Sequence, residues 1–220
     1  MFDVKVIEML LEGIRDTLYM TLASTIAGYI LGLPFGILLY TTGKTGLKPN
    51  IFIYRILDFI CNIVRSVPFL ILLILLIPFT RFVVGRSYGS TATIVPLVIS
   101  AAPYIGRVVE SSLNEVDYGI IEAARSMGAS NTQIIFKVLL VEAKTSLITG
   151  FTITTGLLLG YSAMSGTVGG GGLGDIAVRY GYYRWQTDIM FVTVILLIII
   201  FQIIQYVGNK VSMKLDHRKR

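Results

Sequence analysis

Five long stretches of this 220-residue sequence contain no charged residue. They cover residues 17–42, 66–80, 87–106, 145–174 and 189–209. A helix needs about 20 apolar residues to cross the hydrocarbon core of a bilayer, so the first, third and fifth are long enough on their own. The second must borrow residues upstream, and the fourth exceeds one span. The sequence therefore predicts an all-α integral membrane protein with five transmembrane helices, near 17–42, 54–80, 87–107, 143–166 and 187–209.

The overall composition supports a membrane protein and excludes two other classes. Hydrophobic residues make up 54% of the chain and charged residues only 15%, whereas a typical soluble domain is about 25% charged. So few charges cannot cover a water-exposed surface, and disorder requires the opposite composition. Five spans use most of the length, which leaves no room for a separate catalytic domain.

The positive charges are divided unequally between the two sides of the membrane. Of the 19 Lys and Arg residues, thirteen lie in residues 41–65, 107–144 and the C-terminal tail. The positive-inside rule then predicts an outside N-terminus and an inside C-terminus, an arrangement that requires an odd number of spans. Residues 1–16 mix both charge signs and are expected to form an outer interfacial segment. The permease domain would cover 17–210, and residues 211–220 would form a basic cytoplasmic tail.

No enzymatic site is expected in this chain. Gly43-Lys44-Thr45 lacks the earlier glycine of a phosphate-binding loop, because Leu38 occupies that position. The run 169–174 matches G-x-G-x-x-G but follows a membrane helix, so we expect a flexible outer turn. The single Cys61 and single His217 offer no metal site. We expect no catalytic residue, no metal and no cofactor, and no basic surface suited to nucleic acid.

The spans also show no Asp, Glu or His in their middle, which argues against an ion-coupled transporter. If the protein moves a solute, the energy is expected to come from a partner.

Small residues at a spacing of four predict close helix packing. Gly28, Gly32 and Gly36 line one side of the first span, and Gly156 and Gly160 repeat the spacing in the fourth. Packing within one chain is favoured over dimerisation through these glycines.

One face of the second span is polar. Arg55, Asp58, Asn62 and Arg65 follow at steps of three, four and three, so they share a helix face. Either the face is solvated at the membrane interface, with Arg55 and Asp58 paired, or it lines an aqueous cavity or a subunit seam. Pro68 predicts a kink directly after it.

The inside loop 118–137 has a pattern of its own. It predicts a short helix, a tight turn at Gly128, and a second helix with Ser130 or Asn131 as N-cap. A short helix on the inner face suits docking into a groove on a soluble partner, although an ordinary amphipathic connector remains an alternative.

This loop resembles the signature loop of the permease subunits of bacterial ATP-binding-cassette (ABC) importers, the EAA coupling motif. The matching residues are Glu122, Ala123, Ala124, Gly128 and Leu140, with Val138 in place of the usual Ile. Val141 stands where proline is usual, so the helix entering the fourth span is expected to lack a kink or an N-terminal stop. Segments 65–69, 160–164, 169–175 and 179–182 resemble the methionine-importer subfamily, and the resemblance covers about residues 5–215.

The resemblance implies a type I ABC importer permease fold in the bacterial cell membrane, working as a homodimer. Two copies of a separate cytoplasmic ATPase would bind ATP and Mg²⁺, and an outside substrate-binding lipoprotein would deliver methionine, as the D or L form. The ATPase-coupling residues would be Glu122, Ala123, Ala124, Arg125 and Gly128.

A substrate pathway is expected along the fourth span. Tyr161 and Met164 share a helix face near its outer half, and an aromatic ring with a thioether suits contact with methionine. Ordinary helix packing by these two residues is the alternative. For the whole chain, the alternatives are a permease for another small amino acid or polar solute, an ion-coupled secondary transporter, or a membrane scaffold without transport.

Overall fold

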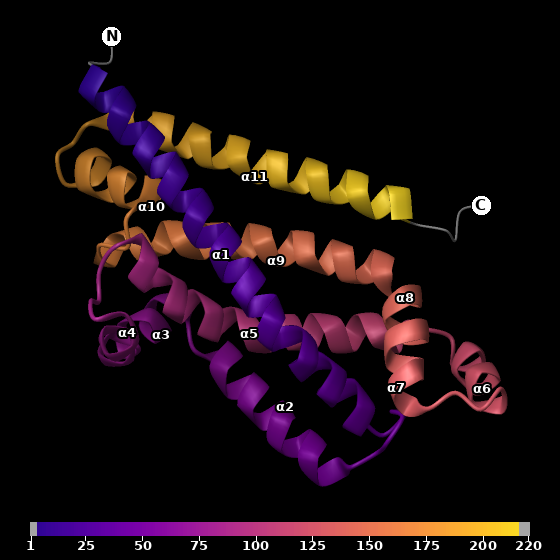
Figure 1. The fold of residues 1–220 in the computed structure, drawn as a ribbon. Helices are drawn as coiled ribbons and strands as arrows, with labels where there is room; N and C mark the ends of the chain where they lie inside the picture. The colour runs from indigo at the N-terminus through magenta and orange to yellow at the C-terminus, as the bar shows by residue number, and fades with distance from the viewer. Residues whose placement is uncertain (1–3, 216–220) are drawn as a thin grey trace.

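The computed structural model describes residues 4–215, and all regular elements in this range are helical (Figure 1). The α-helices are α1 (Val4–Thr42), α2 (Ile51–Ser66), α3 (Phe69–Leu75), α4 (Ile77–Val84), α5 (Ser90–Asn114), α6 (Tyr118–Ser126), α7 (Asn131–Gln133), α8 (Leu140–Glu142), α9 (Lys144–Ser165), α10 (Gly172–Ile176) and α11 (Thr187–Leu215). Two π-helical segments, Ile134–Leu139 and Ala177–Tyr182, and a 3₁₀ turn, Gly166–Val168, join them.

Four of these helices, α1, α5, α9 with its 3₁₀ extension, and α11, are long and apolar enough to cross a membrane. A fifth span results if the bent pair α2 and α3 counts as one. The expected all-helical membrane fold is confirmed, and the five expected spans correspond to these four helices and the bent pair.

The second span is broken where the sequence places Pro68. Helices α2 and α3 meet at an angle of 100°. Val67 is extended (φ −83°, ψ 124°) because the ring of a following proline disfavours the helical conformation. The kink expected at Pro68 is therefore present, and it is a sharp break.

The N-terminal residues are not a separate element. Helix α1 runs without a break from Val4, so residues 4–16, expected to form their own interfacial segment, are the first turns of the first span helix. Leu173 of α10 packs on this part of α1, and its amide donates a hydrogen bond to Thr17 Oγ1 (2.8 Å). Residues 1–3 lie outside the described residues.

At the C-terminal end, α11 includes residues 211–215 of the expected basic tail. Residues 216–220, which include His217, lie outside the described residues.

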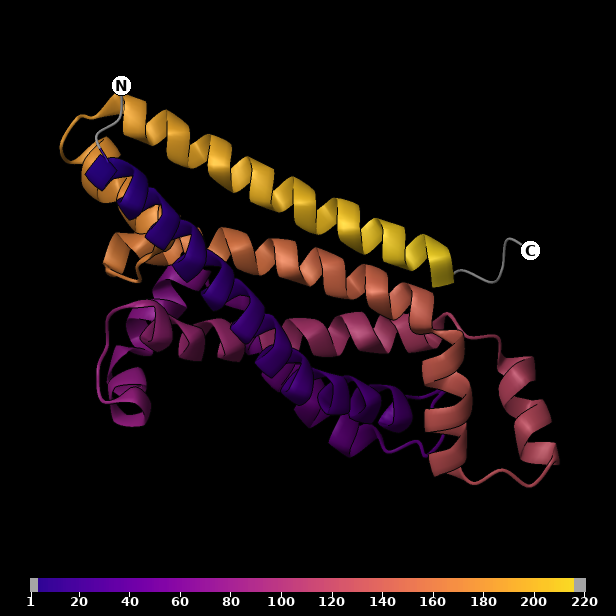
Figure 2. The same ribbon diagram turned by 45° about the horizontal axis from the view of Figure 1, so that its top comes forward.

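The glycine stripe of α1 packs against α5. Helix α1 runs obliquely across α5 and α9 in both ribbon views (Figures 1 and 2). A methyl group at Gly32 would lie 2.7 Å from Ile105 Cβ, and one at Gly36 would lie 2.5 Å from Val109 Cβ. The glycines therefore let the two helix backbones approach, as expected for packing within one chain. Gly156 faces Phe201 of α11 in the same way, whereas Gly160 faces open space.

The glycine-rich run 169–174 is packed, so the expectation of a flexible turn is wrong. Gly169, Gly171 and Gly172 have φ values between 76° and 82°, which other residues rarely adopt. These turns direct α10 back into the molecule, where Leu173 and Ile176 are buried against α1. The glycines thus shape a compact return of the chain.

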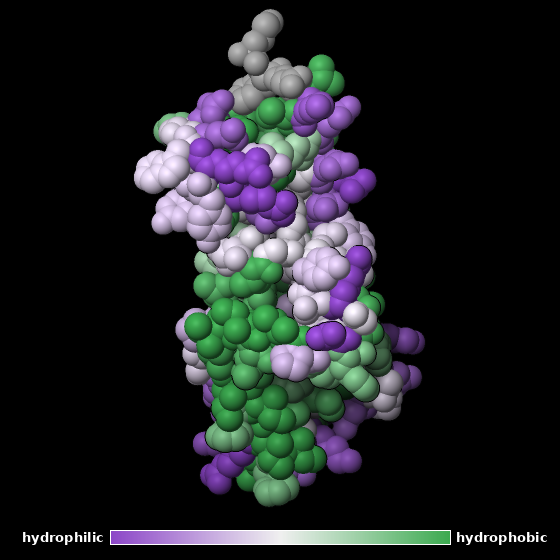
Figure 3. Space-filling view, turned by 90° about the vertical axis from the view of Figure 1, so that its left-hand side faces the viewer, coloured by the Kyte–Doolittle hydropathy of each residue, from purple (hydrophilic) through white to green (hydrophobic). Residues whose placement is uncertain are grey.

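Much of the remaining surface is apolar. Phe82 is 87% exposed and Phe191 65% exposed. Figure 3 shows a broad hydrophobic surface over the lower half of one end of the molecule, the end where Figure 1 places α3 and α4. Such a surface fits a lipid environment or contact with another subunit.

The α1–α5 packing can be tested with a matched pair of glycine substitutions. Gly36→Ala should lower the free energy of unfolding by about 1–3 kcal/mol, because the added methyl overpacks the contact with Val109. Gly160→Ala should not lower it, because nothing lies within 4 Å of the added methyl. Unfolding of the purified permease in detergent measures both; equal stability of the two variants would contradict the close contact.

Candidate functional site

The loop between α5 and α9 forms a helical hairpin at one end of the bundle (Figures 1 and 2). Asp117 caps α6 by accepting a hydrogen bond from the amide of Gly119 (2.6 Å). Gly128 then adopts a left-handed conformation (φ +81°) that reverses the chain. Ser130 caps α7 in a capping box with Gln133. The helix, turn and capped helix expected for residues 118–137 are all present.

Helix α6 has a buried side and an exposed side. Ile121 and Ala124 are buried in the main core, 3% and 4% exposed. Glu122, Ala123 and the Gly128 turn are exposed, and a methyl group at Gly128 would meet no atom within 4 Å. Ala124, expected among the ATPase-coupling residues, therefore packs inside its own chain.

Arg125 connects this hairpin to the α1–α2 loop (residues 43–50). Its guanidinium donates a hydrogen bond to the backbone carbonyl oxygen of Leu47, 3.3 Å away. The sequence suggested a contact with a partner for Arg125, and nothing in the pattern around it pointed to residue 47. The bond ties together two segments that are 78 residues apart.

The chain bends before α9 although Val141 replaces the usual proline. The π-helical segment Ile134–Leu139 and α8 run at a steep angle to α9 (Figure 1), and the helix is interrupted at Ala143, which is buried. The expectation that Val141 removes the kink is wrong. Because Ala143 is anchored in the core, packing imposes the bend without a proline.

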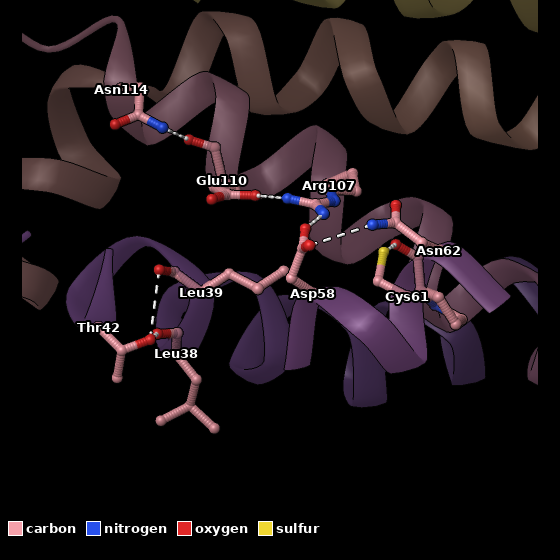
Figure 4. A network of polar contacts seen from close by, with 10 residues as sticks. Leu38, Leu39, Thr42, Asp58, Cys61, Asn62, Arg107, Glu110 and Asn114 are labelled. Carbon is pink, nitrogen blue, oxygen red and sulfur yellow. Dashed lines mark hydrogen bonds and ion pairs between the residues drawn. The ribbon is translucent and has the colours of Figure 1, made fainter. Parts of the chain in front are cut away.

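A polar network joins α2 to α5 (Figure 4). Arg107 forms ion pairs with Asp58 of α2 and with Glu110 of its own helix (2.7 Å for Glu110), and Asn62 donates to Asp58 (3.1 Å). Asp58 thus pairs with Arg107 rather than with Arg55. Sequence analysis missed Arg107 and Glu110, although two opposite charges three residues apart near the end of an apolar span were a usable signal.

Cys61 completes the contact between these helices. It is fully buried, and its thiol donates to the carbonyl oxygen of Pro103 (3.2 Å). Arg65, the last member of the polar face, lies 5.9 Å from the ring centre of Tyr104. The polar face of α2 therefore contacts α5 at Asp58 and Arg65, while Asn62 is exposed and supports Asp58 from the same helix.

Tyr161 and Met164 occupy different surroundings on α9. The Tyr161 ring stacks on Phe69 of α3, with ring centres 4.4 Å apart and planes 3° from parallel. Met164 is half exposed. Tyr161 thus packs against the segment that follows the break in the second span, and Met164 points to the surface. Within residues 4–215, no group of three His, Cys, Asp or Glu side chains is placed to hold a metal ion.

Within residues 4–215, membrane-spanning helices and a helical hairpin at one end of the bundle fit the membrane subunit of a transport system. Residues 32–211 match the family described as "Binding-protein-dependent transport system inner membrane component". The chain belongs to this family, and it is the inner membrane permease component of an ABC transporter.

Relatives and solved structures agree with this assignment. The "Probable D-methionine transport system permease protein MetI" of Vibrio cholerae is 50% identical, covering 96% of this chain and 94% of the relative. The "Methionine import system permease protein MetP" of Bacillus subtilis is 44% identical, covering 92% and 91%. A chain in a structure of inward facing conformations of the MetNI methionine ABC transporter is 44% identical, with a TM-score of 0.97 over 98% of this chain and 100% of that one. The expected family is confirmed.

Proposed function

We propose that this chain carries methionine, in its D or L form, across the inner membrane as the permease subunit of an ATP-driven importer. Identity of 44% to 50% over nearly the whole chain to permeases named for methionine supports the substrate. A TM-score of 0.97 to a chain of a methionine ABC transporter supports the architecture. Another small amino acid is the second candidate, because a few side chains suffice to change specificity within one fold.

The proposed assembly is a homodimer of this chain with two copies of a cytoplasmic ATPase and an outer substrate-binding lipoprotein. The ATPase holds ATP and Mg²⁺. The hairpin at 118–137 belongs to the regions that together hold thirteen of the 19 basic residues. The positive-inside rule therefore predicts that it faces the cytoplasm. Closure of the ATPase dimer would then shift the hairpins and favour one of two states of the spans, because the two states make different contacts with the ATPase.

Within this hairpin, Glu122, Ala123 and Gly128 are the proposed ATPase-contacting surface. These three residues are exposed, and the exposed Met127 (82%) precedes the turn. Ala124 and Arg125 have a supporting role, since Ala124 anchors α6 in the core and Arg125 holds the α1–α2 loop. A force on the exposed side of α6 is thereby transmitted to α1 and α2.

The coupling role can be tested at Gly128. Gly128→Asp should lower ATP-driven methionine uptake about tenfold or more, because a carboxylate would be buried against the ATPase without a partner. Gly128→Asn is the matched control: Asn has nearly the same size and tolerates the left-handed conformation without adding a charge, so it should retain much more uptake. Membrane insertion of both variants should be normal. Full uptake by inserted Gly128→Asp would remove Gly128 from the coupling surface.

Tyr161 and Met164 are the proposed contacts of the substrate pathway. Tyr161 stacks on Phe69 directly after the break in the second span, where a change in the α2–α3 angle would move it. Met164→Ala should lower the uptake rate of methionine relative to a shorter amino acid, because the thioether contact is lost. Competition between labelled methionine and alanine in vesicles measures this, and an unaltered preference and rate would exclude Met164 from the pathway.

The network around Arg107 also argues against the ion-coupled secondary transporter considered from the sequence, in agreement with the family match. Its carboxylates, Asp58 and Glu110, lie inside α2 and α5. Both are already paired with Arg107, which favours a structural role over binding of a transported cation.

A further inference from the structure

A cavity of about 580 Å³ lies between the inner ends of α1 and α5, the α1–α2 loop and α6. The side chains that matter most for its chemistry are Tyr40, Lys44, Asn114, Tyr118 and Arg125. The cavity is therefore built from two stretches of the chain, residues 40–49 and 114–125, that are far apart in the sequence. It is separate from the proposed substrate pathway at Tyr161 and Met164.

The cavity carries positive charge without a counter-charge. Lys44 and Arg125 line it, and none of the described residues in its lining is acidic. Neither side chain takes part in an ion pair within residues 4–215. Arg125 has one hydrogen bond, to the Leu47 carbonyl oxygen, which is uncharged. Two cations beside tyrosine and asparagine side chains form a suitable environment for an anion such as a phosphate group.

The position of the cavity indicates where this anion comes from. It lies where α1 ends at Thr42 and α5 ends at Asn114. With the N-terminus outside, as the positive-inside rule predicts, these helix ends lie near the inner lipid headgroups. Leu38, one turn before the end of α1, is 49% exposed, and Phe52 at the start of α2 is 72% exposed. Helices α1 and α2 therefore expose apolar side chains suited to acyl chains at the ends that flank the α1–α2 loop.

Most of the proposed ATPase contact lies away from the cavity side of α6, and Glu122 alone borders the cavity, one turn from both Tyr118 and Arg125. Tyr118, Ile121 and Arg125 recur at helical spacing and line the cavity. Ala123 lies on the far side of the same helix and is exposed. Docking of the ATPase on Ala123 and the Gly128 turn would not cover the residues of α6 that line the cavity.

We propose that this cavity binds the phosphate headgroup of an anionic phospholipid between Lys44 and Arg125. The bound lipid bridges the α1–α2 loop and α6, and so reinforces the Arg125–Leu47 connection between them. The site does not depend on which substrate the permease carries.

Two loop lysines provide a matched test. Lys44 lines the cavity, whereas Lys48, four residues further along the same exposed loop, does not. One lysine near an anionic surface contributes about 1 kcal/mol, so Lys44→Gln should weaken binding of phosphatidylglycerol about fivefold. Lys48→Gln should leave the affinity unchanged. Native mass spectrometry of the purified complex with its ATPase, titrated with phosphatidylglycerol or phosphatidylcholine, measures the affinity of each variant.

Each other outcome contradicts the proposal. If both substitutions weakened phosphatidylglycerol binding equally, the attraction would be a general effect of positive charge. If phosphatidylcholine bound as tightly as phosphatidylglycerol, the cavity would not select an anionic headgroup. Displacement of the lipid by inorganic phosphate or glycerophosphoglycerol would identify a site for soluble phosphate. Loss of the ATPase from lipid-free Lys44→Gln would show that the partner protein fills the cavity.

Discussion

The close contact between α1 and α5 is the constraint on which the rest of the structure depends. Gly32 and Gly36 bring the two backbones together where any larger side chain would meet Ile105 or Val109. Lipid gives no hydrophobic driving force between helices, so such close packing is a main source of their association. With α5 fixed against α1, the position of Arg107 is fixed as well, and through it the position of α2.

The same contact determines where the inner loops lie. Helix α1 ends beside α5, so its following loop comes within reach of Arg125 in the hairpin after α5. One hydrogen bond then connects the hairpin to the α1–α2 loop, and one ion pair connects α2 to α5. The account of coupling follows from this sequence of contacts: a displacement of α6 moves α1 and α2 because they are physically joined to it.

The sequence predicted well what local chemistry decides. The uncharged stretches predicted the positions of the spans, and the glycine spacing predicted close helix packing. Ser130 was predicted as an N-cap, and its hydroxyl does cap the second helix of the hairpin. Features set by distant parts of the chain were missed. Asp58 pairs with Arg107 of α5, which lies far away in the sequence, and Ala124 is buried by a core to which many segments contribute.

Energy supply is the central claim. The permease has spans, a hairpin and internally paired charges, and a separate ATPase is proposed to supply the energy for transport. The most direct measurement is methionine uptake into proteoliposomes, with the permease alone and with its ATPase and binding protein. The account predicts uptake only with the ATPase and ATP, unaffected when proton and sodium gradients are abolished. Uptake by the permease alone, driven by an ion gradient, would contradict it.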